Sequence, residues 1–207
     1  MASITASITS GGTLLAHTQQ ATATVTRGSA IDVSTKYSFR CFVAMGRSVA
    51  TALTNEVQFR IEASAKSSGA DEWYPAYVWR SSYGKTACNA TTLNDASVLA
   101  SDTAFTVTSG TGLSGGETIY LRETGTPANS EWVNVDSVSG TTVNCEALTR
   151  NHTNGITVTD YAEKWVFDID VADIARVRLV VDSASNASGQ TVDVIGWYSS
   201  LDSNTVT

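Results

Sequence analysis

Hydrophobic and polar residues alternate singly along most of the chain, which is the pattern of β-strands with one buried face. Residues 165–182, WVFDIDVADIARVRLVVD, show it twice, with aromatic and aliphatic side chains on one side and Asp and Arg side chains on the other. Successive side chains of a strand point to opposite faces, so this period of two predicts strands. The same alternation recurs in KYSFRCFVAMG, EVQFRIEASAK and EWYPAYVWRSS, which begin at Lys36, Glu56 and Glu72. No long amphipathic helix is predicted, and only residues 47–55 suit a single helical turn.

A second group of predicted strands is short and closely spaced. AFTVT, ETIYLRE, EWVNVDSV, TTVNCEAL and ITVT follow one another between residues 104 and 159, separated by glycine-rich turns. Such spacing is typical of a small β-barrel or sandwich. Longer strands then resume and continue to the C-terminal QTVDVIGWYSSLDS. We therefore predict an all-β chain: a β-sandwich, formed by residues 1–95 and 161–207, that is interrupted by an inserted small β-barrel or sandwich module, residues 96–160.

An insertion of this kind costs little, because the entropy of closing a loop grows slowly with its length. The alternative, two or three consecutive domains, leaves the last strands without a sheet. The first 30 residues are rich in Ala, Thr, Ser and Gly and alternate only weakly. They predict an extended N-terminal arm, which can add a strand to the sheet edge of a neighbouring subunit.

Charge and composition exclude several classes of function. The chain has 13 Lys and Arg against 20 Asp and Glu, a net charge of −7, and no basic cluster. Such a chain repels phosphate backbones, so we expect no nucleic-acid partner. It has no run of 18 apolar residues, and its first 20 residues lack the basic and apolar regions of a signal peptide, so we expect no membrane partner and synthesis in a host cytoplasm. Cys41, Cys88 and Cys145 lie far apart, a spacing that favours neither a disulfide framework nor a zinc site.

Two motifs resemble catalytic or metal-binding sites but lack the required context. Gly112–Gly116, GLSGG, matches the G-x-S-x-G of hydrolases, and His152 follows it in the order expected for such enzymes. That motif needs a helix directly after the serine, whereas here a strand is predicted. Asp168, Asp170 and Asp173 are spaced D-x-D-x-x-D without the glycine and distal glutamate of an EF-hand. We therefore predict no catalytic residues, no metal site, no cofactor and no enzymatic activity.

Two minor alternatives for the aspartates remain: a weak calcium site at a loop end, and a glycosidase carboxylate pair. The simpler interpretation is a solvated sheet face, on which Arg60, Arg176 and Arg178 can pair with these carboxylates across neighbouring strands.

The aromatic strand of residues 72–83 is the best candidate for binding. Simple alternation places Trp73, Pro75, Tyr77 and Trp79 on one face. Three interpretations stay open: part of the sandwich core, a subunit interface, or a platform for sugar rings. Because Pro75 has no N–H to donate to a sheet, this strand is predicted to be an edge strand or to carry a bulge.

Three blocks of the chain resemble virion proteins of tailed bacteriophages. They are GSAIDVSTKYSFRCFVAMGR, EVQFRIEASAKSSGADEWYPAYVWRSS and ARVRLVVDSASNASGQTVDVIGWYSSLDS. The section between Phe105 and Gly155 is similar to small β modules that recur in phage structural proteins. The blocks cover most of the chain, and they carry no catalytic residues.

The resemblance implies a capsid decoration or cement protein with a jelly-roll-like sandwich, located on the outer capsid surface of the virion. Its expected partners are the major capsid protein and other copies of itself, as a trimer. Neck and tail proteins of the same virion, and a carbohydrate- or receptor-binding module, are the alternatives. The net negative charge agrees with a position outside the shell, away from the packaged DNA.

Overall fold

The computed structural model describes residues 4–20, 24–48, 50–69, 72–82, 87–160, 162–184, 186 and 191–206, with side chains from residue 11 to residue 201. Strands dominate this part of the chain, as the alternating pattern predicts, and the 3-10 turn Pro127–Asn129 is its only helical segment. The helical turn expected in residues 47–55 is wrong, because Arg47 ends strand β4 and the other described residues of this segment form bends and irregular structure. The all-β prediction is confirmed.

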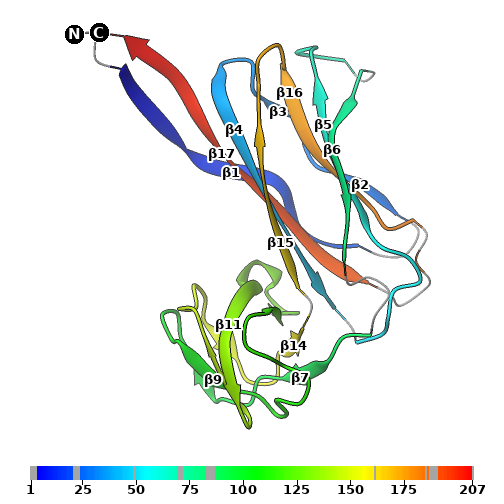
Figure 1. The fold of residues 1–207 in the computed structure, drawn as a ribbon, viewed down its shortest axis with the longest axis vertical. Helices are drawn as coiled ribbons and strands as arrows, with labels where there is room; N and C mark the ends of the chain where they lie inside the picture. The colour runs from blue at the N-terminus through cyan, green and yellow to red at the C-terminus, as the bar shows by residue number, and fades with distance from the viewer. Residues whose placement is uncertain are drawn as a thin grey trace.

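Two antiparallel sheets face each other in a sandwich (Figure 1). The first sheet contains, in order, β1 (Ile4–Gln20), β17 (Val192–Val206), β4 (Lys36–Arg47) and β15 (Glu163–Ile169). The second contains β2 (Val25–Arg27), β16 (Arg176–Asp182), β5 (Gln58–Ser64) and β6 (Tyr74–Arg80), and β3 (Ile31–Asp32) also pairs with β16. Strands that follow each other in the chain mostly cross from one sheet to the other.

The inward faces of both sheets form one hydrophobic core, as alternation predicts. In β4, Phe39, Cys41 and Val43 are buried, and Phe59 and Ile61 of β5 meet them from the opposite sheet. The buried cluster is completed by side chains of β1, β16, β17 and the loops. Burying large apolar side chains stabilises the fold by about 1.5–3 kcal/mol each.

The inserted strands form a small closed barrel with a core of its own. Its strands are, in order, β7 (Ala90–Thr92), β14 (Thr157–Thr159), β10 (Thr118–Arg122), β11 (Glu131–Ser139), β12 (Thr142–Cys145) and β9 (Ala104–Thr106). A bridge between Leu93 and Val107 joins the two outer strands and closes the sheet. The short strands β8 (Ser97–Val98) and β13 (His152–Thr153) pair beside it. We call this unit the barrel module.

The barrel module begins earlier than residue 96, because β7 is one of its strands. Hydrogen bonds between Asn89 and Asp160 join the two ends of the module where the chain passes to and from the sandwich. The buried carboxylate of Asp160 accepts hydrogen bonds from the backbone N–H of Asn89, at 2.8 Å, and from its side-chain amide, at 2.6 Å. The predicted boundary lies too late because Ala90–Thr92 is too short to show alternation.

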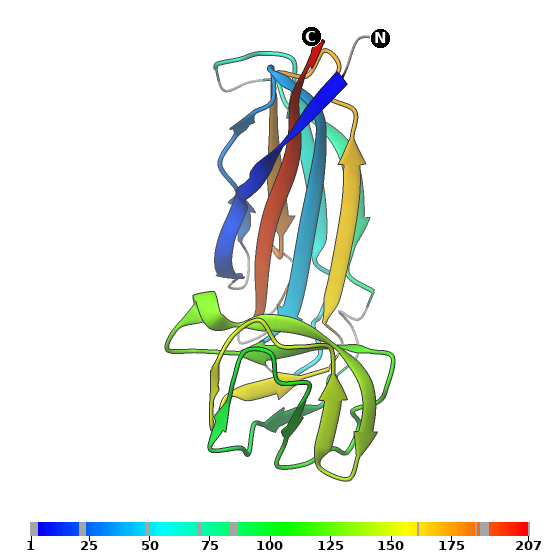
Figure 2. The same cartoon turned by 90° about the vertical axis from the view of Figure 1, so that its left-hand side faces the viewer.

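The N-terminal segment is not a loose arm. From Ile4 to Gln20 it pairs with β17 as the edge strand of the first sheet, and Leu14 and Leu15 lie in the core. Only the first residues of β1 and the last of β17 continue past β4 as a two-stranded ribbon. This ribbon, in which Ile4 pairs with Val206, projects from the end of the sandwich that lies opposite the barrel module (Figure 2).

Candidate interaction surfaces

A β-bulge in β6 separates the four residues predicted to share a face. Ile61 of β5 pairs with Tyr77, but the next residue, Glu62, pairs with Pro75, so Ala76 is an extra residue. Because a bulge adds one residue, the side chains beyond it point to the opposite face of the sheet from the one that simple alternation predicts. The prediction of one shared face is therefore wrong. The prediction from Pro75 is right, since β6 is both an edge strand and bulged.

Tyr77 and Trp79 point inward and close the seam between the two sheets. The Trp79 ring lies 4.4 Å from that of Phe167 on β15, and the Tyr77 ring lies 5.0 Å from it. The Tyr77 hydroxyl donates to the backbone oxygen of Asp168 at 2.7 Å. These two residues are thus structural, although Tyr77 remains 38% exposed.

Trp73 lies on the outer face of the second sheet, where it covers two arginines. The guanidinium carbon of Arg178 is 4.1 Å from the centre of the Trp73 ring, and that of Arg176 is 5.0 Å away. Arg178 also pairs with Glu62 at 2.6 Å. Such cation–π contacts hold the indole flat against the sheet. Pro75 is exposed, and it pairs with Glu62 of β5.

The acidic stretch of residues 165–182 does not form one face, because β15 and β16 belong to opposite sheets, and its exposed Asp168 is not paired with the arginines predicted. Asp168 pairs with Arg40 on the neighbouring strand at 2.6 Å, and the hydrogen bond from Arg40 lowers the pKa of Asp168. Asp170 accepts from the backbone N–H of Ala172 in the turn before β16. Arg176 donates to the carbonyl of Lys66. Asp168 and Asp170 therefore have structural roles, in the first sheet and in the turn before β16.

The GLSGG segment is a turn and does not form a nucleophile elbow. Gly112 and Gly116 have φ angles of 88° and 87°, a left-handed backbone that favours glycine. The backbone N–H of Ser114 donates to Glu117 at 2.5 Å, and strand β10 follows directly. The expectation of a strand after the serine is confirmed.

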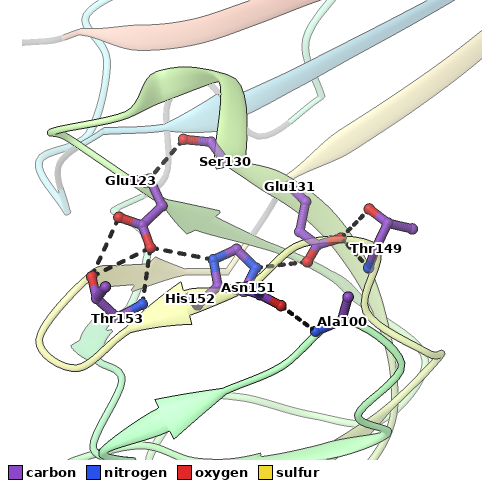
Figure 3. Close-up of polar contacts among 8 residues, drawn as sticks. All are labelled: Ala100, Glu123, Ser130, Glu131, Thr149, Asn151, His152 and Thr153. Atoms are coloured by element: carbon purple, nitrogen blue, oxygen red, sulfur yellow. Dashed lines mark hydrogen bonds and ion pairs between the residues drawn. The ribbon is translucent and has the colours of Figure 1, made fainter.

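His152 belongs instead to a buried polar cluster in the barrel module (Figure 3). Its Nε2 lies 2.6 Å from Glu131, and its Nδ1 lies 3.5 Å from Glu123. Glu131 also accepts from the backbone and the hydroxyl of Thr149, at 3.0 and 2.8 Å. Burial alone would raise the pKa of Glu131, but the hydrogen bonds from His152 and Thr149 outweigh it and lower that pKa. The cluster ties the loops around β13 to strands β10 and β11.

The cluster predicts a pH-dependent loss of stability in Glu131→Gln. A carboxylate whose pKa is lowered by folding stabilises the fold above about pH 4.5, its ordinary pKa, and this contribution disappears as the pH falls. We expect the variant to lose about 2 kcal/mol at pH 7, the value of a hydrogen-bonded charged group, and much less at pH 3. Urea denaturation at both pH values measures this. Asp136→Asn, an exposed carboxylate on the same strand, is the control. A Glu131→Gln deficit that is equal at both pH values contradicts the prediction.

The barrel module is held against the first sheet by a small buried junction. The Tyr120 ring of β10 lies on Gly46 of β4, so closely that a Cβ added at Gly46 would sit 2.3 Å from the ring. The Tyr120 hydroxyl donates to Asp193 of β17 at 2.9 Å, and Arg122 Nε donates to the same oxygen at 2.6 Å. Burial raises the pKa of Tyr120, so its hydroxyl stays protonated. His17 Nε2 lies 2.9 Å from the Tyr120 oxygen and is the donor there, because the hydroxyl proton goes to Asp193.

Beside this junction lies a cleft of about 570 Å³ between the barrel module and the outer face of the first sheet. Its walls include Trp132, Glu146 and Arg150 from the module, and Thr13, Lys164 and Trp197 from the sheet. The alternating pattern alone does not indicate this site, because its two walls come from segments that alternate like any other strand. The sequence does contain one signal of the site: a tryptophan stands where the alternation predicts a polar residue, Trp132 in β11 and Trp197 in β17.

Comparison with known proteins gives no relative: no family model, no curated protein sequence and no solved structure matches this chain. Within the described residues, no group of His, Cys, Asp and Glu is arranged to hold a metal ion. No helix in that part of the chain is long and apolar enough to cross a membrane. Cys41, Cys88 and Cys145 are buried, and none of the three is part of a disulfide in the described part of the chain.

Proposed function

We propose that this chain is a structural protein of a tailed-bacteriophage particle, an accessory capsid protein of the decoration or cement kind. The observation that carries the proposal is the strand order of the sandwich. When β2 and β3 are counted as one interrupted strand, the first sheet has the order 1-8-3-6 and the second has the order 2-7-4-5. This order supports a jelly-roll assignment, and double-sheet jelly rolls are common among viral capsid domains.

The exposed surfaces of the sandwich support a role in assembly. Strand β6 is an open sheet edge, and it exposes Tyr74, Tyr77 and Val78 by 66%, 38% and 53%. An edge strand offers unpaired backbone groups to another chain, and large apolar side chains exposed along such an edge favour a contact there. We therefore propose β6 as a subunit contact. Because of the bulge, Trp73 and Pro75 lie on the outer face of the second sheet, and Tyr77 and Trp79 lie on its inner face.

The partners in this proposal are the major capsid protein and other copies of the chain. Closed symmetry is the default for identical subunits, and the threefold positions of a capsid lattice favour a trimer. The net charge of −7 supports a place on the outer surface, away from DNA. Binding the assembled shell but not its dissociated parts stabilises the shell by mass action against internal pressure.

Cryo-electron microscopy of the phage particle that carries this chain tests the proposal. We expect threefold density on the outer capsid surface into which the sandwich and the barrel module fit. Particles that lack the chain should lose their DNA at a lower temperature than complete particles. Density at the neck, the tail or the inner wall, or equal thermal stability of the two particles, would overturn the decoration role.

Light scattering after size exclusion tests the subunit contact. Val78→Lys places a charge on the exposed side of β6 and should shift a trimer toward monomer, whereas Val166→Lys, on an exposed position of β15, should not. A wild-type chain that is monomeric both free and on the particle would contradict the trimer.

A further inference from the structure

From its lining, we infer that the cleft between the barrel module and the first sheet is a binding site for a saccharide that carries a carboxylate group. This site is independent of the structural role proposed above. It also differs from the sugar platform considered for Trp73, Tyr77 and Trp79, because the bulge in β6 puts those rings on different faces. The cleft lies between two folded units, and its volume of about 570 Å³ falls within the range of small-molecule sites.

The aromatic part of the cleft offers flat apolar surface beside polar groups, the combination on which sugar rings stack. The Trp197 ring is 38% exposed and stacks on Phe42 with one face, at 5.7 Å. Its neighbour on the other side, across β1, is the small residue Thr13, so no large side chain of that strand covers its second face. Across the cleft, the Trp132 ring is held by stacking on Tyr120, and its indole N–H is buried without a hydrogen-bond partner in the described part of the chain. Both rings are therefore fixed in place before any ligand binds.

Among the charged side chains that line the cleft, Arg150 is the one without an ion pair in the described part of the chain. Lys164 and Glu146 pair with each other at 3.3 Å, and the carboxylate of Glu131 is occupied by His152 and Thr149. Arg150 is exposed, and it makes no hydrogen bond or ion pair with any residue that the structure describes. A guanidinium binds a carboxylate through two parallel hydrogen bonds, which fixes its orientation.

A nucleotide fits this lining less well than an acidic sugar. A phosphate dianion calls for several cations or a ring of backbone N–H groups, and the cleft has a single unmatched arginine. The overall charge of −7 also repels strongly anionic ligands. One carboxylate on an otherwise neutral ring is the charge that Arg150 can neutralise.

An NMR titration of the ¹⁵N-labelled full chain tests the inference. The chain has five tryptophans and thus five indole N–H signals, of which those of Trp132 and Trp197 are assigned from Trp132→Phe and Trp197→Phe. The probes are 3′-sialyllactose and tri-galacturonate, with lactose and galactotriose as neutral counterparts and AMP as the nucleotide. We expect saturable shifts of the Trp132 and Trp197 signals with at least one of the two acidic saccharides, and weaker or no shifts with its neutral counterpart.

Two pairs of variants locate the site. Arg150→Ala should weaken acidic-saccharide binding at least tenfold, whereas Arg27→Ala, an exposed arginine on β2, should leave it unchanged. Trp197→Ala should abolish binding, whereas Trp73→Ala should not. The signals outside the cleft report whether each variant is folded. The inference is overturned by the absence of saturable shifts with both acidic saccharides, by equal binding of neutral and acidic sugars, by a response to AMP alone, or by full binding in Arg150→Ala.

Discussion

Replacing Asp193 with alanine is expected to lower the free energy of unfolding by about 3 kcal/mol, the cost of breaking a buried charge pair. Asp193 is 1% exposed, and one of its oxygens accepts hydrogen bonds from both Tyr120 and Arg122. Without the carboxylate, the guanidinium of Arg122 and the hydroxyl of Tyr120 lose their partner at the junction. The barrel module should then separate from the first sheet more readily.

Asp168→Ala is a closely matched control for this prediction. Asp168 also pairs with an arginine Nε at 2.6 Å, but the side chains of Asp168 and Arg40 are 71% and 52% exposed. Exposed ion pairs contribute little, so this variant should unfold at nearly the same urea concentration as the wild type. Urea denaturation followed by tryptophan fluorescence measures both variants. Equal losses in the two variants would contradict the view that burial makes the junction pair important.

A double-mutant cycle with Arg122→Ala separates the ion pair from its surroundings. If the two charges act together, the double variant should be little less stable than Asp193→Ala alone. Additive losses would show that each side chain contributes through other contacts. In that case the Tyr120 ring on Gly46, and not the ion pair, would carry the junction.

The sandwich strands were predictable because each has one buried and one open face. Phe39, Cys41 and Val43 of β4 and Phe59 and Ile61 of β5 are buried at alternate hydrophobic positions, and no distant contact is needed to identify them, whereas Val43–Arg47 is buried on both faces. The bulge at Ala76 was not predictable in this way. Apolar residues lie on both sides of it, Trp73 and Tyr74 before and Tyr77 and Trp79 after, so a one-residue slip leaves the hydrophobic pattern intact.

The junction depends on contacts that the local pattern does not contain. Asp193 occupies a polar position of its strand, and it is buried by the barrel module rather than by its own sheet. Gly46 gave a usable signal, since glycine in a strand often marks a close approach by another part of the chain. Nothing in the sequence identifies Tyr120, 74 positions away, as the group that approaches it.

The N-terminal segment was also predictable only in part. Its weak alternation indicated an extended segment, which is correct, but the short hydrophobic sequence of Leu14 and Leu15 did not reveal a place in the core. Bulges flank these residues, with register shifts on both sides of Leu15. The irregular pairing lets two consecutive leucines be buried at 1% and 6% exposure. A strict period of two cannot anticipate that.

Removing residues 2–20 is therefore expected to unfold the chain, whereas removing residues 2–9 is expected to leave it folded. The longer deletion takes away both core leucines and the edge strand that covers β17. Truncating one buried leucine to alanine costs about 2–5 kcal/mol, and a domain is stable by only about 5–15 kcal/mol. The shorter deletion removes the end of an edge strand, which normally frays at little cost.

Circular dichroism melting distinguishes the two deletions. The 2–9 deletion should melt within a few degrees of the full chain, and the 2–20 deletion should show no cooperative transition. Leu14→Ala in the full chain separates the core contribution from strand pairing, because it removes side-chain packing and keeps the backbone hydrogen bonds. If it loses stability by a few kcal/mol but still melts cooperatively, the core packing of β1 is measured directly. A 2–20 deletion that melts like the full chain would mean that β1 contributes nothing to the stability of the sandwich. The N-terminal segment would then be the separate arm that the sequence predicts.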